Sequence, residues 1–128
     1  MRLNRFLFDP SKRGLRKVLK EWEALVLRYA WEHEGEFIES WPIWTHVNEV
    51  LSGSGRSISR ASIIFFLDDM SELGVLSREV VVGKGGTRDK YRALMDERGY
   101  RKFIVTTILK SSFRDFPEAT RQVVKELA

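Results

Sequence analysis

Cysteine is absent from the 128-residue chain, which excludes disulfide bonds, thiolate metal ligands and a cysteine nucleophile. Histidine is scarce as well. The only two are His33 and His46, and the stretch "HEGEF" lacks the second histidine of an H-E-x-x-H zinc motif. No G-x-S-x-G elbow of a serine hydrolase occurs either. We therefore expect no enzyme, no metal site and no cofactor.

Long apolar runs are also missing. No run of about 18 apolar residues exists, so we expect no segment that crosses a membrane. The start, "MRLNRFLFDPSKRG", has neither the apolar stretch nor the small-residue cleavage site of a secretory signal peptide. Together with the absence of cysteine, these features predict a cytoplasmic protein of ordinary globular composition.

Charge is distributed in blocks along the chain. Residues 1–20 hold seven Lys and Arg residues against one Asp, whereas residues 21–53 hold one Arg against seven Glu. The remainder is mildly basic, and the whole chain carries a net charge of +4. A basic face suggests a partner that carries phosphate or other acidic groups, while a merely solvated surface is the plain alternative.

Three helices are predicted in the first half of the chain. Apolar residues between Leu15 and Trp31 recur three and four positions apart, as in an amphipathic helix, and Gly35 would end it. Pro42 suits the first turn of a second helix that reaches about Leu51. A third helix follows Ser57 or Ser59 as its N-cap and ends at Gly74. Its expected buried stripe is Ile63, Phe66, Leu67, Met70 and Leu73.

Strands and further helices are predicted in the second half. "VLSREVVV" and "DKYRALM" read as two strands around a glycine-rich segment, and Phe37–Glu39 reads as an additional short strand. Asp96 can cap a fourth helix, and Pro117 begins a last one. This order is that of a winged helix. We therefore predict an α+β, mainly helical fold, with a winged-helix DNA-binding domain and basic extension in residues 1–95 and a helical dimerisation arm in residues 96–128.

The stretch "GKGG" at residues 83–86 could belong to a phosphate-binding loop or to a hairpin. A P-loop needs G-x-x-x-x-G-K-[ST], but Arg78 stands where the first glycine should be and Gly85 where Ser or Thr should follow the lysine. The segment after the glycines also reads as a strand rather than a helix. A hairpin tip fits better, because glycine supplies the positive φ angles of tight turns.

The third predicted helix has an outward face that could contact DNA. At about 100° per residue, Ala61, Phe65, Asp68 and Glu72 point away from the buried stripe, with Ser62, Ile64 and Asp69 on the flanks. In helix-turn-helix proteins the N-terminal half of such a helix enters the major groove. There an Arg can pair with guanine, and an apolar group can pack on a thymine methyl. The three acidic residues would have to leave the groove or pair with basic groups.

Two stretches resemble a known family. "ISRASIIFFLDDMSELGVLSR" is similar to a winged-helix recognition helix that leads into the first wing strand, and "KRGLRKVLKEWEALVLRYAWE" resembles the first helix of the penicillinase-repressor family. The resemblance covers residues 13–116 and includes Trp31, the glycine-rich wing and the helical tail. It implies a dimeric transcriptional repressor whose C-terminal helices form the dimer interface. The third helix departs from the family in being apolar and acidic.

The sequence thus predicts sequence-specific binding to double-stranded DNA by a homodimer that acts as a repressor, and it contains no motif for an effector. The predicted DNA-binding residues are Arg56, Ser59, Arg60, Ser62, Phe65, Lys84, Arg88 and Lys90. The predicted dimer interface consists of Tyr100, Phe103, Ile104, Thr107, Ile108 and Ser111. One alternative is a winged-helix protein-interaction module whose apolar third helix faces a protein, and another is an RNA-binding winged helix.

Overall fold

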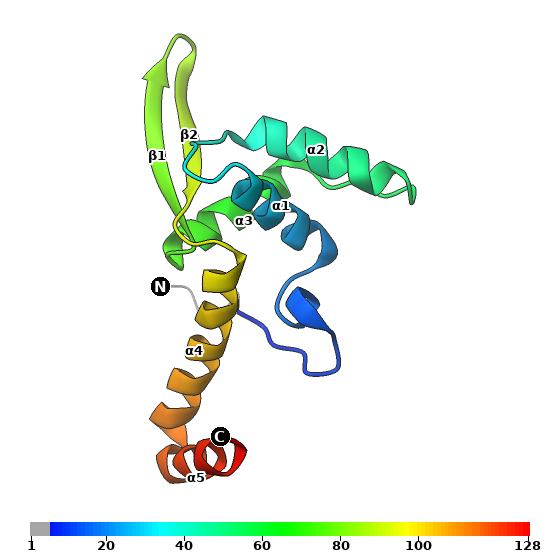
Figure 1. Ribbon diagram of the computed structural model, residues 1–128. Coiled ribbons are helices and arrows are strands. Elements are labelled where there is room, and N and C mark those ends of the chain that lie inside the picture. The colour runs from blue at the N-terminus through cyan, green and yellow to red at the C-terminus, as the bar shows by residue number, and fades with distance from the viewer. Residues whose placement is uncertain (1–5) are drawn as a thin grey trace. The chain divides into compact units, whose positions relative to one another are not determined.

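The computed structural model describes residues 6–128, which divide into two compact units after Glu97. The first unit contains, in chain order, a 3-10 helix Gly14–Lys17, α1 Glu21–Glu32, α2 Ser40–Ser52, α3 Arg60–Glu72, β1 Leu76–Gly83 and β2 Gly86–Ala93. The second unit is built from α4 Glu97–Asp115 and α5 Pro117–Leu127. Figure 1 shows the two strands as one long hairpin beside the three helices of the first unit.

The first unit has the winged-helix fold that the sequence predicts. Helices α1, α2 and α3 pack on one another, α3 also packs on β1, and the two strands pair in antiparallel register. Mainly helical structure with a single β-hairpin confirms the predicted fold class. The hairpin is the wing.

The core of the first unit is built around one face of α3. All five residues of the predicted stripe are buried, and Phe66 also meets the ring of Trp22 from α1 edge to face, with 5.6 Å between the ring centroids. Burial of such a side chain contributes roughly 1.5–3 kcal/mol to folding. Because the stripe fixes which side of α3 faces inward, it also fixes the side that faces solvent.

Two expectations about the helices are wrong in detail. The first helix begins at Glu21 rather than Leu15, because Lys20 has extended backbone angles and its backbone N–H donates to the carboxylate of Glu23 at 2.7 Å. This contact caps the helix start. Asp69 was expected on the flank of the outward face of α3, but it is only 6% exposed. It lies three residues after Phe66, on the buried side of the helix.

The predicted short strand at Phe37–Glu39 is reduced to a single bridge. Ile38 and Tyr91 exchange both backbone hydrogen bonds, at 2.7 and 2.8 Å, and no longer ladder forms there. Pro42 follows closely in the first turn of α2, so the extended segment has no room to continue. The bridge nevertheless ties the segment between α1 and α2 to strand β2.

The second unit consists of two helices joined at Phe116. Pro117 occupies the start of α5, as the sequence predicts. The hydroxyls of Ser112 on α4 and Thr120 on α5 lie 2.6 Å apart, and Thr120 is buried. This hydrogen bond links the end of α4 to the first turn of α5. No helix within residues 6–128 is long and apolar enough to cross a membrane.

The two faces of α3 predict a sharp contrast in stability between adjacent phenylalanines. Phe66→Ala removes a side chain that is 1% exposed and should lower the free energy of unfolding by about 3–5 kcal/mol. Phe65→Ala removes one that is 69% exposed and should change it by no more than about 0.5 kcal/mol. Urea unfolding followed by circular dichroism measures both. Equal losses would mean that α3 presents a different face to the core.

Candidate nucleic-acid interface

The first turn of α3 is organised by its N-cap. The Ser59 hydroxyl accepts the backbone N–H of Ser62 at 3.1 Å, and the two serine hydroxyls lie 2.9 Å apart. Of the two predicted caps, Ser59 is therefore the one used. Arg60 follows directly, and its Nε donates to the Ser40 hydroxyl at the start of α2, at 3.3 Å. An arginine has five N–H donors, so most of the guanidinium fork remains available for a ligand.

The outward face of α3 carries a large apolar side chain. Phe65 is 69% exposed, one of the highest exposures among the large apolar side chains of the first unit. Ala61, one turn earlier, is also exposed, and Ile64 beside it is half-buried. This arrangement matches the predicted outward face, and it leaves an apolar group in the N-terminal half of the helix.

The glycine-rich segment is the tip of the wing, as predicted. Gly83 pairs with Gly86, so Lys84 and Gly85 form the turn between the strands. Gly85 and Gly86 have φ angles of 94° and 115°, in the region that favours glycine. Because a strand rather than a helix follows these glycines, the segment lacks the geometry of a P-loop.

The three predicted cations of the wing lie on its turn and on β2. Lys84 is exposed at the tip, Arg88 is exposed on β2, and Lys90 is half-buried. Lys90 stands directly across from Glu79 of β1 in the strand register. The charge of Lys90 thus has a carboxylate-bearing residue as its cross-strand neighbour.

Two of the predicted DNA-binding arginines are held by carboxylates of neighbouring elements. The Arg88 guanidinium lies 3.7 Å from Glu39, just before α2. The Arg56 guanidinium donates to Glu21 at the start of α1, at 3.0 Å. This hydrogen bond is the main reason why the pKa of Glu21 lies below its ordinary value. Both ion pairs are solvent-accessible, so a phosphate can compete with either carboxylate.

A buried tyrosine links the wing to α3. Tyr91 is 1% exposed, and its hydroxyl donates to Asp68 at 2.7 Å. Arg78 of β1 lies 3.7 Å from Asp68 and 3.0 Å from Asp89. Burial, together with the hydrogen bond to Asp68, raises the pKa of Tyr91 well above its ordinary value. Asp68 therefore pairs with a basic group of the wing, which is one of the two arrangements expected for it.

A polar cleft of about 200 Å³ lies where α2, α3 and the wing approach one another. It brings two of the predicted DNA-binding residues, Arg60 and Arg88, together with two carboxylates, and the rest of its lining is neutral. The carboxylates are Glu39 and Asp89, and the neutral residues are Ser40, Ile64, Thr87 and Tyr91. The other predicted residues do not line it. The contributions of Tyr91 and Arg78 escaped the sequence reasoning, although an aromatic residue in a polar strand was a signal that the position faces the core.

The residues of the predicted dimer interface lie on α4. Phe103, Ile104, Thr107 and Ile108 are half-buried and Ser111 is exposed, whereas Tyr100 is only 2% exposed within the single chain. Sequence reasoning did not name the exposed apolar residues of α5. These are Val123, Val124 and Leu127.

Comparisons with known proteins show the fold of this chain. No family model and no curated protein sequence matches it. Among solved structures, it is similar to a candidate transcriptional regulator from Methanosarcina mazei Go1, with a TM-score of 0.53 and 15% identity over 84% of this chain and 78% of that one. It is also similar to a candidate transcriptional regulator from Thermoplasma acidophilum, with a TM-score of 0.48 and 16% identity over 83% and 87% of the two chains.

A third similar structure is the ORC1 protein of Aeropyrum pernix in complex with DNA. Its TM-score is 0.54, with 19% identity over 67% of this chain. This chain spans about a quarter of the ORC1 protein, 24% of its length. At such identities, the likenesses to the ORC1 protein and to the Methanosarcina mazei protein support the winged-helix architecture and no more. The resemblance to penicillinase repressors has no matching family model and stays a prediction.

The φ angles at the wing tip predict different effects of two alanine substitutions. Gly85→Ala forces a residue with a side chain to a φ of 94° and should destabilise the protein by about 1–2 kcal/mol. Gly83→Ala, at the other side of the turn, meets no atom within 4 Å and has no positive φ, so it should be nearly neutral. Thermal unfolding of the two variants tests this. A neutral Gly85→Ala would argue against the observed turn.

Proposed function

We propose that this chain binds double-stranded DNA as a homodimer and represses transcription. The observation that carries the proposal is the cleft between α3 and the wing, because Arg60 of α3 and Arg88 of the wing both line it beside the exposed first half of α3. Two similar structures are consistent with DNA binding by this fold. One is the ORC1 protein in complex with DNA, and the other is the candidate transcriptional regulator from Methanosarcina mazei Go1.

Sequence reading is assigned to the first two turns of α3. In this position of a helix-turn-helix protein, side chains reach base edges in the major groove. The free donors of Arg60 suit the two acceptors of a guanine, and the exposed ring of Phe65 suits a thymine methyl. Ser62 is committed in part to the N-cap, so its hydroxyl contributes at most one further contact.

The wing and the turn before α3 are assigned to the phosphate backbone. Lys84 at the tip is fully free to reach phosphate in the described structure, whereas Arg88 and Arg56 must first exchange Glu39 and Glu21 for phosphate oxygens. Ser59 stays with the helix cap, and Lys90 adds charge from β2. Such contacts position a protein on DNA and carry no base preference.

Dimerisation is assigned to the second unit. Its helices expose large apolar residues, including Val105 of α4 and Leu127 of α5, at 55% and 83%. Apolar groups exposed on both helices are typical of a surface that associates. Two copies would place two α3 helices on successive half-sites, as dimeric helix-turn-helix proteins do. Repression follows if the dimer covers a promoter, which is the role that the family resemblance implies.

A protein-interaction module is the second candidate, because the 69% exposure of Phe65 would equally suit a protein partner. Base-pair discrimination separates the two. Arg60→Ala should weaken binding to the preferred duplex by about 1–3 kcal/mol and relax preference at one base pair. Glu72→Ala, a control at the exit end of α3, should leave discrimination unchanged. Titrations on the duplex and on its single-base variants measure both.

The outcome of that comparison decides between the candidates. Loss of discrimination in Arg60→Ala alone supports base reading by α3. If Arg60→Ala keeps full discrimination while Phe65→Ala abolishes a complex with a protein, the interaction module is the correct function.

The dimer is tested by charge at the apolar positions of α4. Phe103→Glu combined with Ile108→Glu should give a monomer in sedimentation experiments, because burial of unpaired carboxylates in an apolar interface is strongly unfavourable. Lys102→Glu combined with Lys110→Glu alters exposed positions of the same helix and should stay dimeric. A dimer that survives the first pair of changes would place the interface elsewhere.

A further inference from the structure

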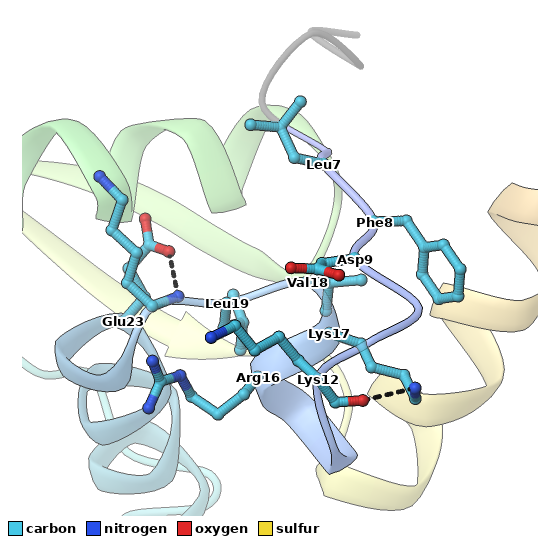
Figure 2. A pocket seen from close by; sticks show the side chains of 10 residues that line it. Leu7, Phe8, Asp9, Lys12, Arg16, Lys17, Val18, Leu19 and Glu23 are labelled. Carbon is cyan, nitrogen blue, oxygen red and sulfur yellow. Dashed lines mark hydrogen bonds between the residues drawn. The ribbon is translucent and has the colours of Figure 1, made fainter.

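The basic segment before α1 lines an open cavity whose residues have no role in the proposed function. Figure 2 shows this cavity, which has a volume of about 340 Å³ and lies between the segment around Leu7 and Phe8 and the start of α1. Four cations line it, against two carboxylates. The cations are Lys12, Arg16, Lys17 and Lys20.

Of these four cations, Lys17 is the one whose side chain makes hydrogen bonds in the described part of the chain. The ammonium group of Lys17 donates to the backbone carbonyls of Pro10 and Lys12 and holds the turn before the 3-10 helix. The side chains of Lys12, Arg16 and Lys20 make no hydrogen bond or ion pair within residues 6–128. They therefore supply three exposed positive charges, of which Lys12 and Arg16 also act electrostatically on Asp9 and Glu21.

The two carboxylates of the cavity already have other partners. Asp9 accepts the backbone N–H and the hydroxyl of Ser11, at 2.9 and 2.6 Å, and these hydrogen bonds lower its pKa. Glu23 is 7% exposed and accepts the backbone N–H of Lys20. Neither carboxylate is paired with Lys12 or Arg16 in the described part of the chain. The cavity rim thus presents net positive charge to solvent.

This basic surface continues toward the start of α3. Arg16 is close enough to Glu21 to lower the pKa of that carboxyl, and the same carboxylate accepts the hydrogen bond from Arg56. Arg56 belongs to the turn that leads from α2 into the N-cap of α3. Arg16 and Arg56 thus both act on Glu21, at the start of α1, and Arg56 leads on to the helix proposed to read DNA.

We propose that Lys12, Arg16 and Lys20 form a second binding surface for backbone phosphates, on DNA that flanks the segment read by α3. The inference rests on the proposed DNA binding. Three separate, exposed cations around one open cavity suit successive phosphates of one strand, whereas a single small anion would use only some of them. Such a surface increases affinity and salt dependence and adds no base preference.

The experiment compares two variants of the full chain that each lose three positive charges. One is Lys12→Ala with Arg16→Ala and Lys20→Ala. Its control is Lys102→Ala with Lys110→Ala and Lys125→Ala, all at exposed positions of the second unit. Binding to one duplex is measured between about 50 and 200 mM salt. Since each phosphate contact adds about 0.9 to the logarithmic salt slope, the first variant should lose roughly 2–3 units of slope.

Over this fourfold range of salt, a slope loss of 2–3 units makes the salt-dependent loss of affinity roughly 16- to 64-fold smaller than in the wild type. The control should keep the wild-type slope, and both variants should keep the wild-type preference among single-base variants and the wild-type unfolding temperature. An unchanged slope in the first variant overturns the inference while leaving the proposed function intact. Equal slope losses in both variants overturn it too, since net charge alone would then explain the effect.

A separate arm distinguishes DNA from a small anion. Inorganic phosphate is titrated against the thermal unfolding of the wild type and of the first variant. Stabilisation that the variant loses, combined with an unchanged DNA slope, would assign the cavity to a small anion and overturn the inference. A wild-type chain that binds no duplex in a salt-dependent manner overturns the proposed function together with this inference.

Discussion

The geometry of the candidate interface depends on the contacts of Tyr91. Its ring is buried, its backbone exchanges two hydrogen bonds with Ile38, and its hydroxyl donates to Asp68. One residue of β2 thereby joins the segment before α2, the middle of α3 and the wing. These connections add to the packing of β1 on α3, and together they stabilise a two-stranded hairpin that would be only marginally stable alone in water. Tyr91 also lines the cleft that holds Arg60 and Arg88.

The ion pairs around the cleft explain how an apolar and acidic helix can belong to a DNA-binding surface. Asp68 is turned toward Arg78 of the wing, and Asp69 is buried, so neither carboxylate stands on the exposed first half of α3. Glu39 and Glu21 hold Arg88 and Arg56, the arginines proposed to contact phosphate. Each pair gives modest stability in the free protein, and phosphate can replace the carboxylate on binding. The acidic residues thus position the basic ones rather than oppose them.

Local signals in the sequence predicted most of the fold. The helical spacing of the Ile63–Leu73 stripe, the Ser59 cap, Gly74 and the glycines of the wing tip each act within a few residues, so sequence patterns reveal them. The periodicity before α1 misled the prediction, because it continues through Leu15 and Leu19 even though Lys20 breaks the helix. Contacts between distant segments were not predictable. Tyr91 with Asp68, Arg88 with Glu39 and Arg56 with Glu21 depend on how the elements pack, which spacing along the chain does not encode.

The central claim is that a positively charged surface around α3 and the wing binds the backbone of double-stranded DNA. The most direct test is a salt titration of the wild-type chain on a mixed-sequence duplex. The account predicts that the logarithm of the association constant falls linearly with the logarithm of salt concentration. Lys84, Arg88, Arg56 and the basic segment before α1 should together release several counterions, so the slope should be on the order of −4 to −6 for each bound chain and about twice that for the dimer. Binding with a slope near zero, or no binding at low salt, would contradict the claim.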